Sequence, residues 1–296
     1  MKINSGVRIA WRIWGGQKGL GPLPLLLPLL MLLLAGCAGR PWTAPVTDQE
    51  GLHIRKIFEE MQQRDAACFS CMDAKVSLFW DGPGEDRSVS GFLQLMLPSS
   101  VKFVVTNPLG QPLYAMVSNG SNFQSINTAL RQHTSGEISA LMQQYSIPAP
   151  LLSDHWGYWL MGRLHEQGAS IDAIHQDESG RGVWITMRYP NEKTLAQSHL
   201  LVQLETKKLL SRILVDQQGG TIATLSYDHG TAPGDCLPVS TLTMTGLPYG
   251  SKLSVEFTEV LMDKVFSVSW FRLKVPPDYE VHVLAGDRDS ENGKKD

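Results

Sequence analysis

The sequence lacks the short signatures that many hydrolases and nucleotide-dependent enzymes carry. It has no Gly-x-Ser-x-Gly nucleophile elbow, and His165-Glu166 is not followed by the second histidine of a zinc protease motif. Gly82 and Gly84 are not followed by the Lys-Ser/Thr of a phosphate-binding loop. The eight histidines are scattered, with no two at ligand spacing on an expected helix. We therefore expect a protein that is not an enzyme, with no catalytic residue, no cofactor and no metal ion.

Acidic residues are absent from residues 1–36, which contain four basic residues and an apolar run over residues 20–34. This layout is typical of a secretory signal. The run ends in Leu34-Ala35-Gly36-Cys37, which resembles the bacterial lipobox and implies lipidation of Cys37 with cleavage before it. In the related sorting rule, an Asp after the lipidated cysteine retains a protein in the inner membrane. Ala38 stands there instead, so we expect a lipid anchor in the outer membrane, on its periplasmic face.

A retained transmembrane helix is the alternative for residues 20–34. About 15 apolar residues are fewer than the ~20 that cross a bilayer, and Pro22, Pro24 and Pro28 interrupt the run. We favour a signal peptide over residues 1–36, a lipidated tether over 37–46, one domain over 47–286 and a disordered polar tail over 287–296.

Positive charge is scarce once the signal is removed. Without residues 1–36, Lys plus Arg falls from 26 to 22 against 29 acidic residues, so the net charge changes from −3 to −7. Nucleic acid is therefore an unfavourable partner. We expect a monomer that contacts the membrane through its lipid anchor.

Cysteines are few, and three remain if Cys37 carries lipid. Cys68 and Cys71 are close enough in sequence for a disulfide if the segment between them is helical or turned. A redox site is a weaker reading because the βαβ context of a thioredoxin-like motif is missing. Zinc binding by Cys68, Cys71, Cys236 and a histidine is a further alternative.

Hydrophobic periodicity predicts a mainly β domain. Thr47 and Glu50 have capping-box spacing, and the apolar residues that follow recur at helical spacing, so a helix begins there. Alternating runs then predict eleven or twelve strands over residues 74–80, 88–97, 101–106, 112–118, 122–127, 182–189, 197–204, 208–215, 221–227, 239–245, 252–260 and 265–273. Helices at 136–144 and 153–164 interrupt this meander. So many antiparallel strands indicate a large barrel or curved sheet that encloses a cavity or a plug, with a helical lid at about 136–164.

Several segments, in order, resemble the LolB family of outer-membrane lipoprotein receptors. They are Ser90-Gly91-Phe92, Asn107-Pro108-Leu109-Gly110-Gln111-Pro112-Leu113, Ile147-Pro148-Ala149-Pro150-Leu151, Trp159-Leu160-Met161-Gly162, Leu237-Pro238 and Leu273-Lys274-Val275-Pro276. The resemblance implies an unclosed antiparallel β-barrel of about eleven strands, wrapped around a helical lid. It also implies an apolar cavity that receives lipoprotein acyl chains from a periplasmic LolA-like carrier. Leu109, flanked by Pro108 and Gly110, matches the family's membrane-insertion leucine; the alternative is a leucine that folds back from the turn onto the core.

The candidate lining of such a cavity comprises flexible methionines and the apolar residues of the lid. These candidates are Met96, Met116, Met142, Met161, Met187, Trp156, Trp159 and Leu160, and Met244 also falls in an expected strand. The alternative is that the methionines fill an ordinary core. For the tryptophans, packing of the lid against the barrel is favoured over a membrane-facing cluster, because Trp156, Trp159 and Leu160 have helical spacing.

Two other functions remain compatible with the sequence. A general periplasmic carrier of lipids or hydrophobic molecules would use the same fold, and a structural outer-membrane lipoprotein would have a filled core. The cysteines, the acidic tail and the long loops near residues 176–182 and 227–235 depart from the LolB pattern.

Overall fold

The computed structural model describes residues 40–152, 155–230, 236, 238–247, 250–262 and 264–284. The expected signal peptide, Cys37 and the acidic tail lie outside these residues. From Pro41 onward the described chain forms one compact unit. Its fold is mainly β, as predicted.

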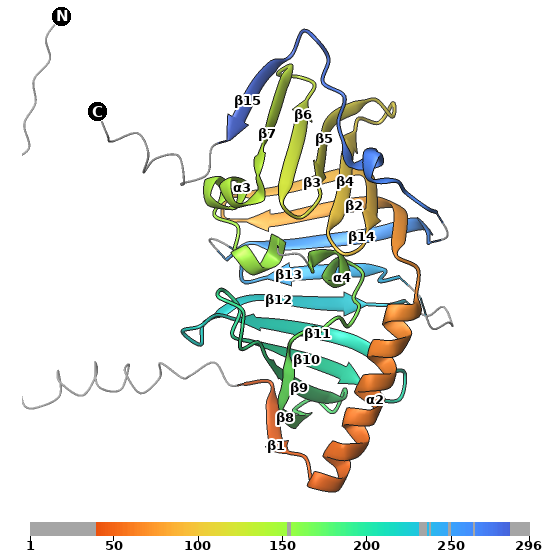
Figure 1. Ribbon diagram of the computed structural model, residues 1–296, viewed down its shortest axis with the longest axis vertical. Coiled ribbons are helices and arrows are strands. Elements are labelled where there is room, and N and C mark those ends of the chain that lie inside the picture. Colours follow the sequence, from red (N-terminus) through yellow and green to blue (C-terminus); the bar gives the residue numbers. More distant parts are fainter. Residues whose placement is uncertain are drawn as a thin grey trace, which may run out of the picture. The chain divides into compact units, whose positions relative to one another are not determined.

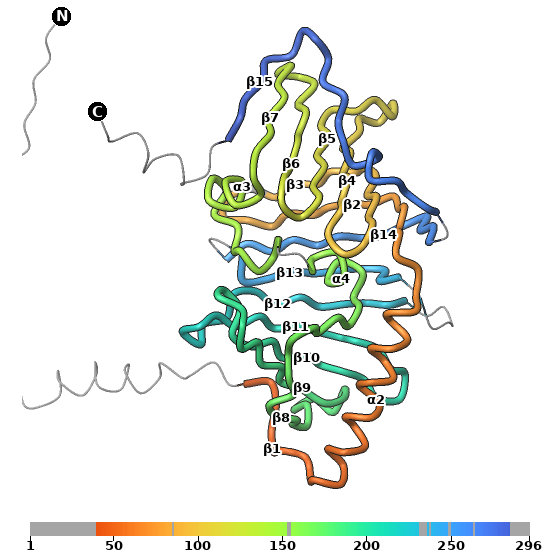
Figure 2. Tube along the Cα trace, in the orientation of Figure 1, coloured from red at the N-terminus to blue at the C-terminus, as the bar shows by residue number. Residues whose placement is uncertain are grey.

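One sheet of fifteen strands contains all strands of the described residues, and it is not closed into a barrel. Its order is β1-β8-β9-β10-β11-β12-β13-β14-β2-β3-β4-β5-β6-β7-β15, and Figures 1 and 2 show its curvature. The strands of the first meander are β2 (Cys71–Gly82), β3 (Glu85–Met96), β4 (Ser100–Thr106), β5 (Pro112–Ser118), β6 (Asn122–Asn127) and β7 (Gln132–Glu137). Those of the second are β8 (Ser170–Asp177), β9 (Val183–Arg188), β10 (Gln197–Gln203), β11 (Lys208–Val215), β12 (Thr221–Asp228), β13 (Thr241–Thr245) and β14 (Lys252–Leu261).

Three pairings complete the sheet. β14 pairs antiparallel with β2 and joins the two meanders. β1 (Trp42–Pro45) pairs antiparallel with β8 at one edge. β15 (Glu280–Leu284) pairs with β7 at the other edge, and this pairing is parallel.

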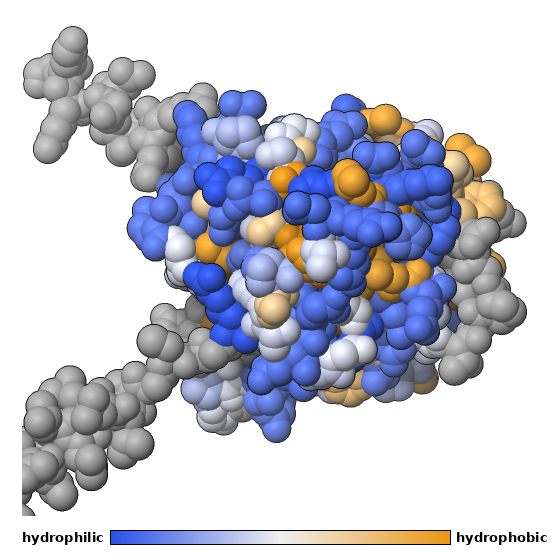
Figure 3. All heavy atoms as spheres, turned by 90° about the horizontal axis from the view of Figure 1, so that it is seen from below, coloured by the Kyte–Doolittle hydropathy of each residue, from blue (hydrophilic) through white to orange (hydrophobic). Residues whose placement is uncertain are grey.

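Helix α2 (Asp48–Ala67) begins where the capping residues predict. The Thr47 hydroxyl accepts a hydrogen bond from the backbone N–H of Glu50 at 3.3 Å, and Ile54, Phe58 and Met61 are buried in the main core. This amphipathic helix covers part of one face of the sheet. The face at the lower end of Figure 1, seen in Figure 3, is mainly hydrophilic with separate hydrophobic patches. No helix in the described ranges is long and apolar enough to cross a membrane.

Three short helices follow β7. They are α3 (Ile138–Tyr145), the 3-10 helix η1 (Ala149–Leu152) and α4 (Trp156–Leu160). We call residues 138–160 the lid. The first helix begins at Ile138 rather than at residue 136, because Ser135–Glu137 continue β7 and pair with β6 and β15.

The strand predicted over residues 265–273 is wrong. This segment contains the 3-10 helix η3 (Val268–Phe271), and Phe266 and Phe271 pack with Cys71 in a small separate cluster. The segment cannot pair with the preceding strand β14, because both edges of β14 are already paired, with β13 and β2. Its alternating apolar pattern instead reflects the packing of Phe266 and Phe271. Strands β1, β7, β8 and β15 were not predicted, and β1 lies within the segment expected to be tether.

The predicted Cys68–Cys71 disulfide is also wrong. Cys68 is bonded to Cys236, with the Cα atoms 5.5 Å apart, and Cys71 is a free, buried thiol. Cys71 is the first residue of β2, where its side chain points toward Phe266 and Phe271, whereas Cys68 caps the end of α2. The bond therefore links α2 to the connection between β12 and β13. No group of three potential metal ligands occurs within the described part of the chain.

Candidate functional site

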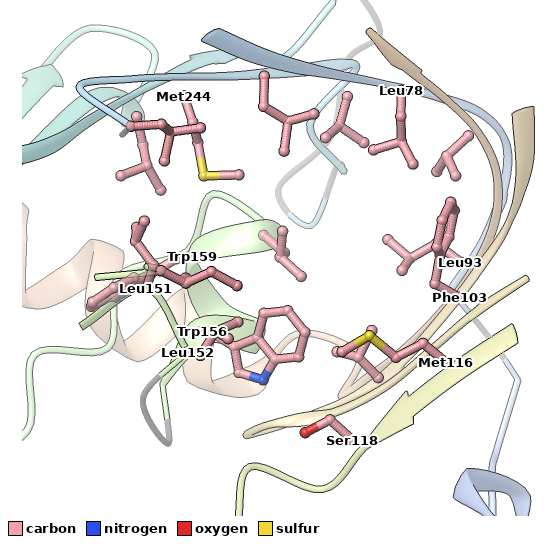
Figure 4. Close-up of a pocket in the computed structure, with 18 of the residues that line it drawn as sticks. Leu78, Leu93, Phe103, Met116, Ser118, Leu151, Leu152, Trp156, Trp159 and Met244 are labelled. Carbon is pink, nitrogen blue, oxygen red and sulfur yellow. The ribbon is translucent and has the colours of Figure 1, made fainter. Parts of the chain in front are cut away.

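A cavity of about 440 Å³ lies between the lid and the sheet. Figure 4 shows side chains from both walls pointing into the same space. The sheet contributes Val76, Leu78, Trp80, Leu93, Val101, Phe103, Met116, Ser118, Leu225, Met244, Leu253 and Val255, and the connection after β13 contributes Leu247. The lid contributes Tyr145, Ile147, Pro148, Leu151, Leu152, Trp156, Trp159 and Leu160.

The lining of this cavity is almost entirely apolar. No lining residue is charged, and only Ser118 and Tyr145 carry a hydroxyl group. The strand pattern accounts for this, because Val76, Leu78 and Trp80 alternate with residues that face the other side of β2. Such a surface favours hydrocarbon, with burial contributing about 0.8 kcal/mol per methylene.

Hydrogen bonds to two backbone carbonyls hold α4 in place as part of the cavity wall. The indole Nε1 of Trp156 donates to the carbonyl of Ser99 at 2.9 Å, and the N–H of Gly157 donates to the carbonyl of Pro98 at 3.1 Å. A Cβ at Gly157 would lie only 2.3 Å from that Pro98 oxygen. Glycine therefore permits the close approach of α4 to the turn between β3 and β4.

A buried ion pair lies behind Trp159. Nη2 of Arg212 donates to Oε1 of Glu166 at 2.7 Å, and both side chains are fully buried. The hydroxyl of Tyr189 donates to Oε2 of Glu166. The Arg212 guanidinium also lies 5.4 Å from the ring centroid of Trp159, so this pair supports one wall of the cavity.

The protonation of this pair follows from its surroundings. Burial alone would raise the pKa of Glu166, but the Arg212 guanidinium and the Tyr189 hydroxyl bring that pKa below its ordinary value. Burial opposes the charge on Arg212, yet the Glu166 carboxylate keeps the pKa of Arg212 above its usual range. Both groups are therefore charged at neutral pH. Sequence reasoning missed them, although an arginine in the centre of the apolar strand 208–215 is a usable signal.

The structure brings only some of the sequence candidates together. Met116, Trp156, Trp159, Leu160 and also Met244 line the cavity. Four other candidates lie elsewhere, since neither strand nor helix periodicity distinguishes a cavity wall from a packed core. Met161 and Met187 are in the main core, Met142 packs beside Phe123 and Leu141, and Met96 packs beside Phe271.

Leu109 lies at the tip of the turn between β4 and β5, with 84% of its surface exposed. The side-chain oxygen of Asn107 accepts hydrogen bonds from the N–H groups of Leu109 and Gln111, each at 2.9 Å. Pro108 is exposed, and Gly110 has a φ of +78°. The turn is thus internally braced and presents the leucine away from the sheet.

The fold of the chain is similar to that of known proteins. No family model and no curated protein matches the sequence. Among solved structures, the chain is similar to a domain from Vibrio parahaemolyticus that is named for outer membrane lipoprotein sorting. The TM-score is 0.54 at 14% identity, over 73% of this chain and 95% of that one.

A LolA superfamily protein from Nitrosomonas europaea is similar as well. The TM-score is 0.52 at 10% identity, over 73% of this chain and 97% of that one. At these identities the comparisons show a common fold. The chain therefore has a LolA-like fold.

Proposed function

We propose that this protein is a lipoprotein anchored in the outer membrane through Cys37. In this proposal it accepts lipoprotein acyl chains in its apolar cavity from a periplasmic LolA-like carrier and helps to insert them into the membrane. The observation that carries the proposal is the cavity of about 440 Å³ without a charged lining residue.

Acyl chains suit this cavity because they have no groups that need hydrogen bonds. Burying ten methylenes would contribute roughly 8 kcal/mol before the costs of ordering the chain. Met116 and Met244 supply flexible thioethers that adapt to chains of irregular shape. The LolA-like fold and the lipobox-like Cys37 support the same role.

Delivery to the membrane is assigned to Leu109. A single exposed leucine is common on protein surfaces, but this one is held at a turn tip by hydrogen bonds to Asn107. In the proposed function it enters the bilayer surface while cargo leaves the cavity.

A general lipid carrier is the second candidate. It is favoured by the lack of charged lining residues, since nothing in the cavity wall selects the peptide part of a lipoprotein. The two functions differ in whether a loaded carrier protein hands cargo over.

The test is a transfer assay with the Cys37→Ala protein and a LolA-family carrier that holds a triacylated lipoprotein. Native mass spectrometry then reports the cargo on each protein. Cargo is expected to move onto the Cys37→Ala protein. Cargo that stays on the carrier would refute the receptor role, and a co-purified phospholipid in the cavity would favour the general carrier.

A matched pair of variants ties transfer to the cavity. Met244 faces the cavity from β13, whereas Thr245 is exposed and faces the opposite side of the strand. Met244→Glu should reduce transfer at least about tenfold, because a carboxylate is costly to desolvate beside an acyl chain. Thr245→Glu, which adds the same charge, should leave transfer unchanged.

A further inference from the structure

Ser118 is the one deeply buried lining residue that carries a hydroxyl group. It is 2% exposed, whereas the other hydroxyl-bearing lining residue, Tyr145, is 61% exposed. Figure 4 shows Ser118 at the edge of the lining, beyond Met116. A polar side chain is unexpected in such a wall, because a hydrophobic residue would bind hydrocarbon better.

The hydrogen bonds of Ser118 leave its proton available. Its Oγ accepts a hydrogen bond from the backbone N–H of Gly120 at 3.1 Å. Among the described residues, no acceptor is recorded for the Ser118 O–H. A hydroxyl has one proton to donate, and a buried donor without an acceptor is costly.

From this we infer that the Ser118 hydroxyl donates a hydrogen bond to the ester carbonyl of an acyl chain bound in the cavity. The inference rests on the proposed function and specifies its ligand as an acyl ester, not hydrocarbon alone. The neighbouring indole of Trp156 does not compete for that carbonyl, because its N–H already donates to Ser99. Ser118 therefore acts as a specificity residue at one end of an otherwise apolar cavity.

Two lipids that differ only in the carbonyl test this role. The probes are dipalmitoyl phosphatidylcholine and its dihexadecyl ether analogue, titrated into the Cys37→Ala protein. The Cys37→Ala protein with Ser118 intact should bind the ester lipid about three- to tenfold more tightly than the ether lipid, as one net hydrogen bond allows. Ser118→Ala should bind both lipids equally, and Ser118→Thr, which keeps the hydroxyl, should restore the preference for the ester.

The comparison between lipids separates specificity from folding. A structural defect in Ser118→Ala lowers the affinity for both lipids and leaves their ratio unchanged. An equal affinity of the unsubstituted protein for ester and ether overturns the inference but not the proposed function. If the protein binds neither of the two lipids nor a triacylated lipopeptide, the proposed function itself is overturned.

The ester could come from a lipoprotein or from a phospholipid. A triacylated lipopeptide is therefore added to the protein loaded with the diester lipid. Displacement of the diester supports the lipoprotein as the source, as the proposed function requires. Retention of the diester overturns the lipoprotein as the source and supports the general lipid carrier.

Discussion

Removing the carboxylate of Glu166 should destabilise the protein severely. In Glu166→Gln the Arg212 guanidinium stays fully buried but loses the negative charge of the carboxylate that lies 2.7 Å away. Breaking a buried pair in this way costs about 3–5 kcal/mol, whereas replacing both partners is often nearly neutral. We therefore expect Arg212→Met/Glu166→Gln to recover most of the loss, because glutamine still offers an oxygen to the Tyr189 hydroxyl.

Urea unfolding of the Cys37→Ala protein and these variants, followed by tryptophan fluorescence, measures the free energies of unfolding. The matched control is Glu259→Gln, which breaks the exposed pair with Lys75 and should cost less than about 1 kcal/mol. If Glu166→Gln costs no more than Glu259→Gln, the reasoning about the buried pair is refuted.

The same pair has a defined pH dependence. The pKa of Glu166 is lower in the folded protein than in the unfolded chain, so its stabilisation is fully present above the unfolded value. It is lost as pH falls through the lower, folded value. The stability difference between the unsubstituted protein and Glu166→Gln should thus be constant from pH 7 to 5 and shrink below about pH 4. A difference that shrinks already between pH 7 and 6 would contradict the direction of this shift.

Two further variants test the turn tip and the disulfide. Leu109→Glu should change the free energy of unfolding by less than about 0.5 kcal/mol yet block release of cargo into vesicles. Leu52→Glu, at a residue that is 71% exposed on α2, should leave both stability and release unchanged. Normal release by Leu109→Glu would exclude the wedge role. Cys68→Ala/Cys236→Ala should lower the free energy of unfolding by about 2–5 kcal/mol, and adding reductant to the unsubstituted protein should lower it equally. A double variant as stable as the oxidised protein would contradict this.

Most of the sheet could be predicted from hydrophobic alternation, and the exceptions have local causes. β8 was missed because its pairing with β9 shifts register between Ile171 and Ala173, which breaks the period-two pattern. β7 has no large apolar side chain, so no hydrophobic alternation marks it. β1 and β15 are short strands at the two edges of the sheet.

The site was predictable in kind but not in detail. The lid residues Trp156, Trp159 and Leu160 followed from helical spacing, and they do line the cavity. The sequence marks Arg212 as unusual in its strand, but the roles of Ser118 and Arg212 could not be assigned from it, because they depend on contacts between distant segments. Arg212, for example, meets Glu166 and Ser198 only after three segments have come together.

The order of strands also has a consequence for the chain while it is being made. One neighbour of β2 is β3, which follows it directly, but the other is β14, where Lys252 pairs with Asp81. Until residues 252–261 are released, the first meander therefore ends in an open edge that other chains could pair with. Because β14 and β2 are far apart in sequence, we expect their pairing, at the middle of the finished sheet, to form late. A truncated or delayed chain is therefore exposed to aggregation at its future centre.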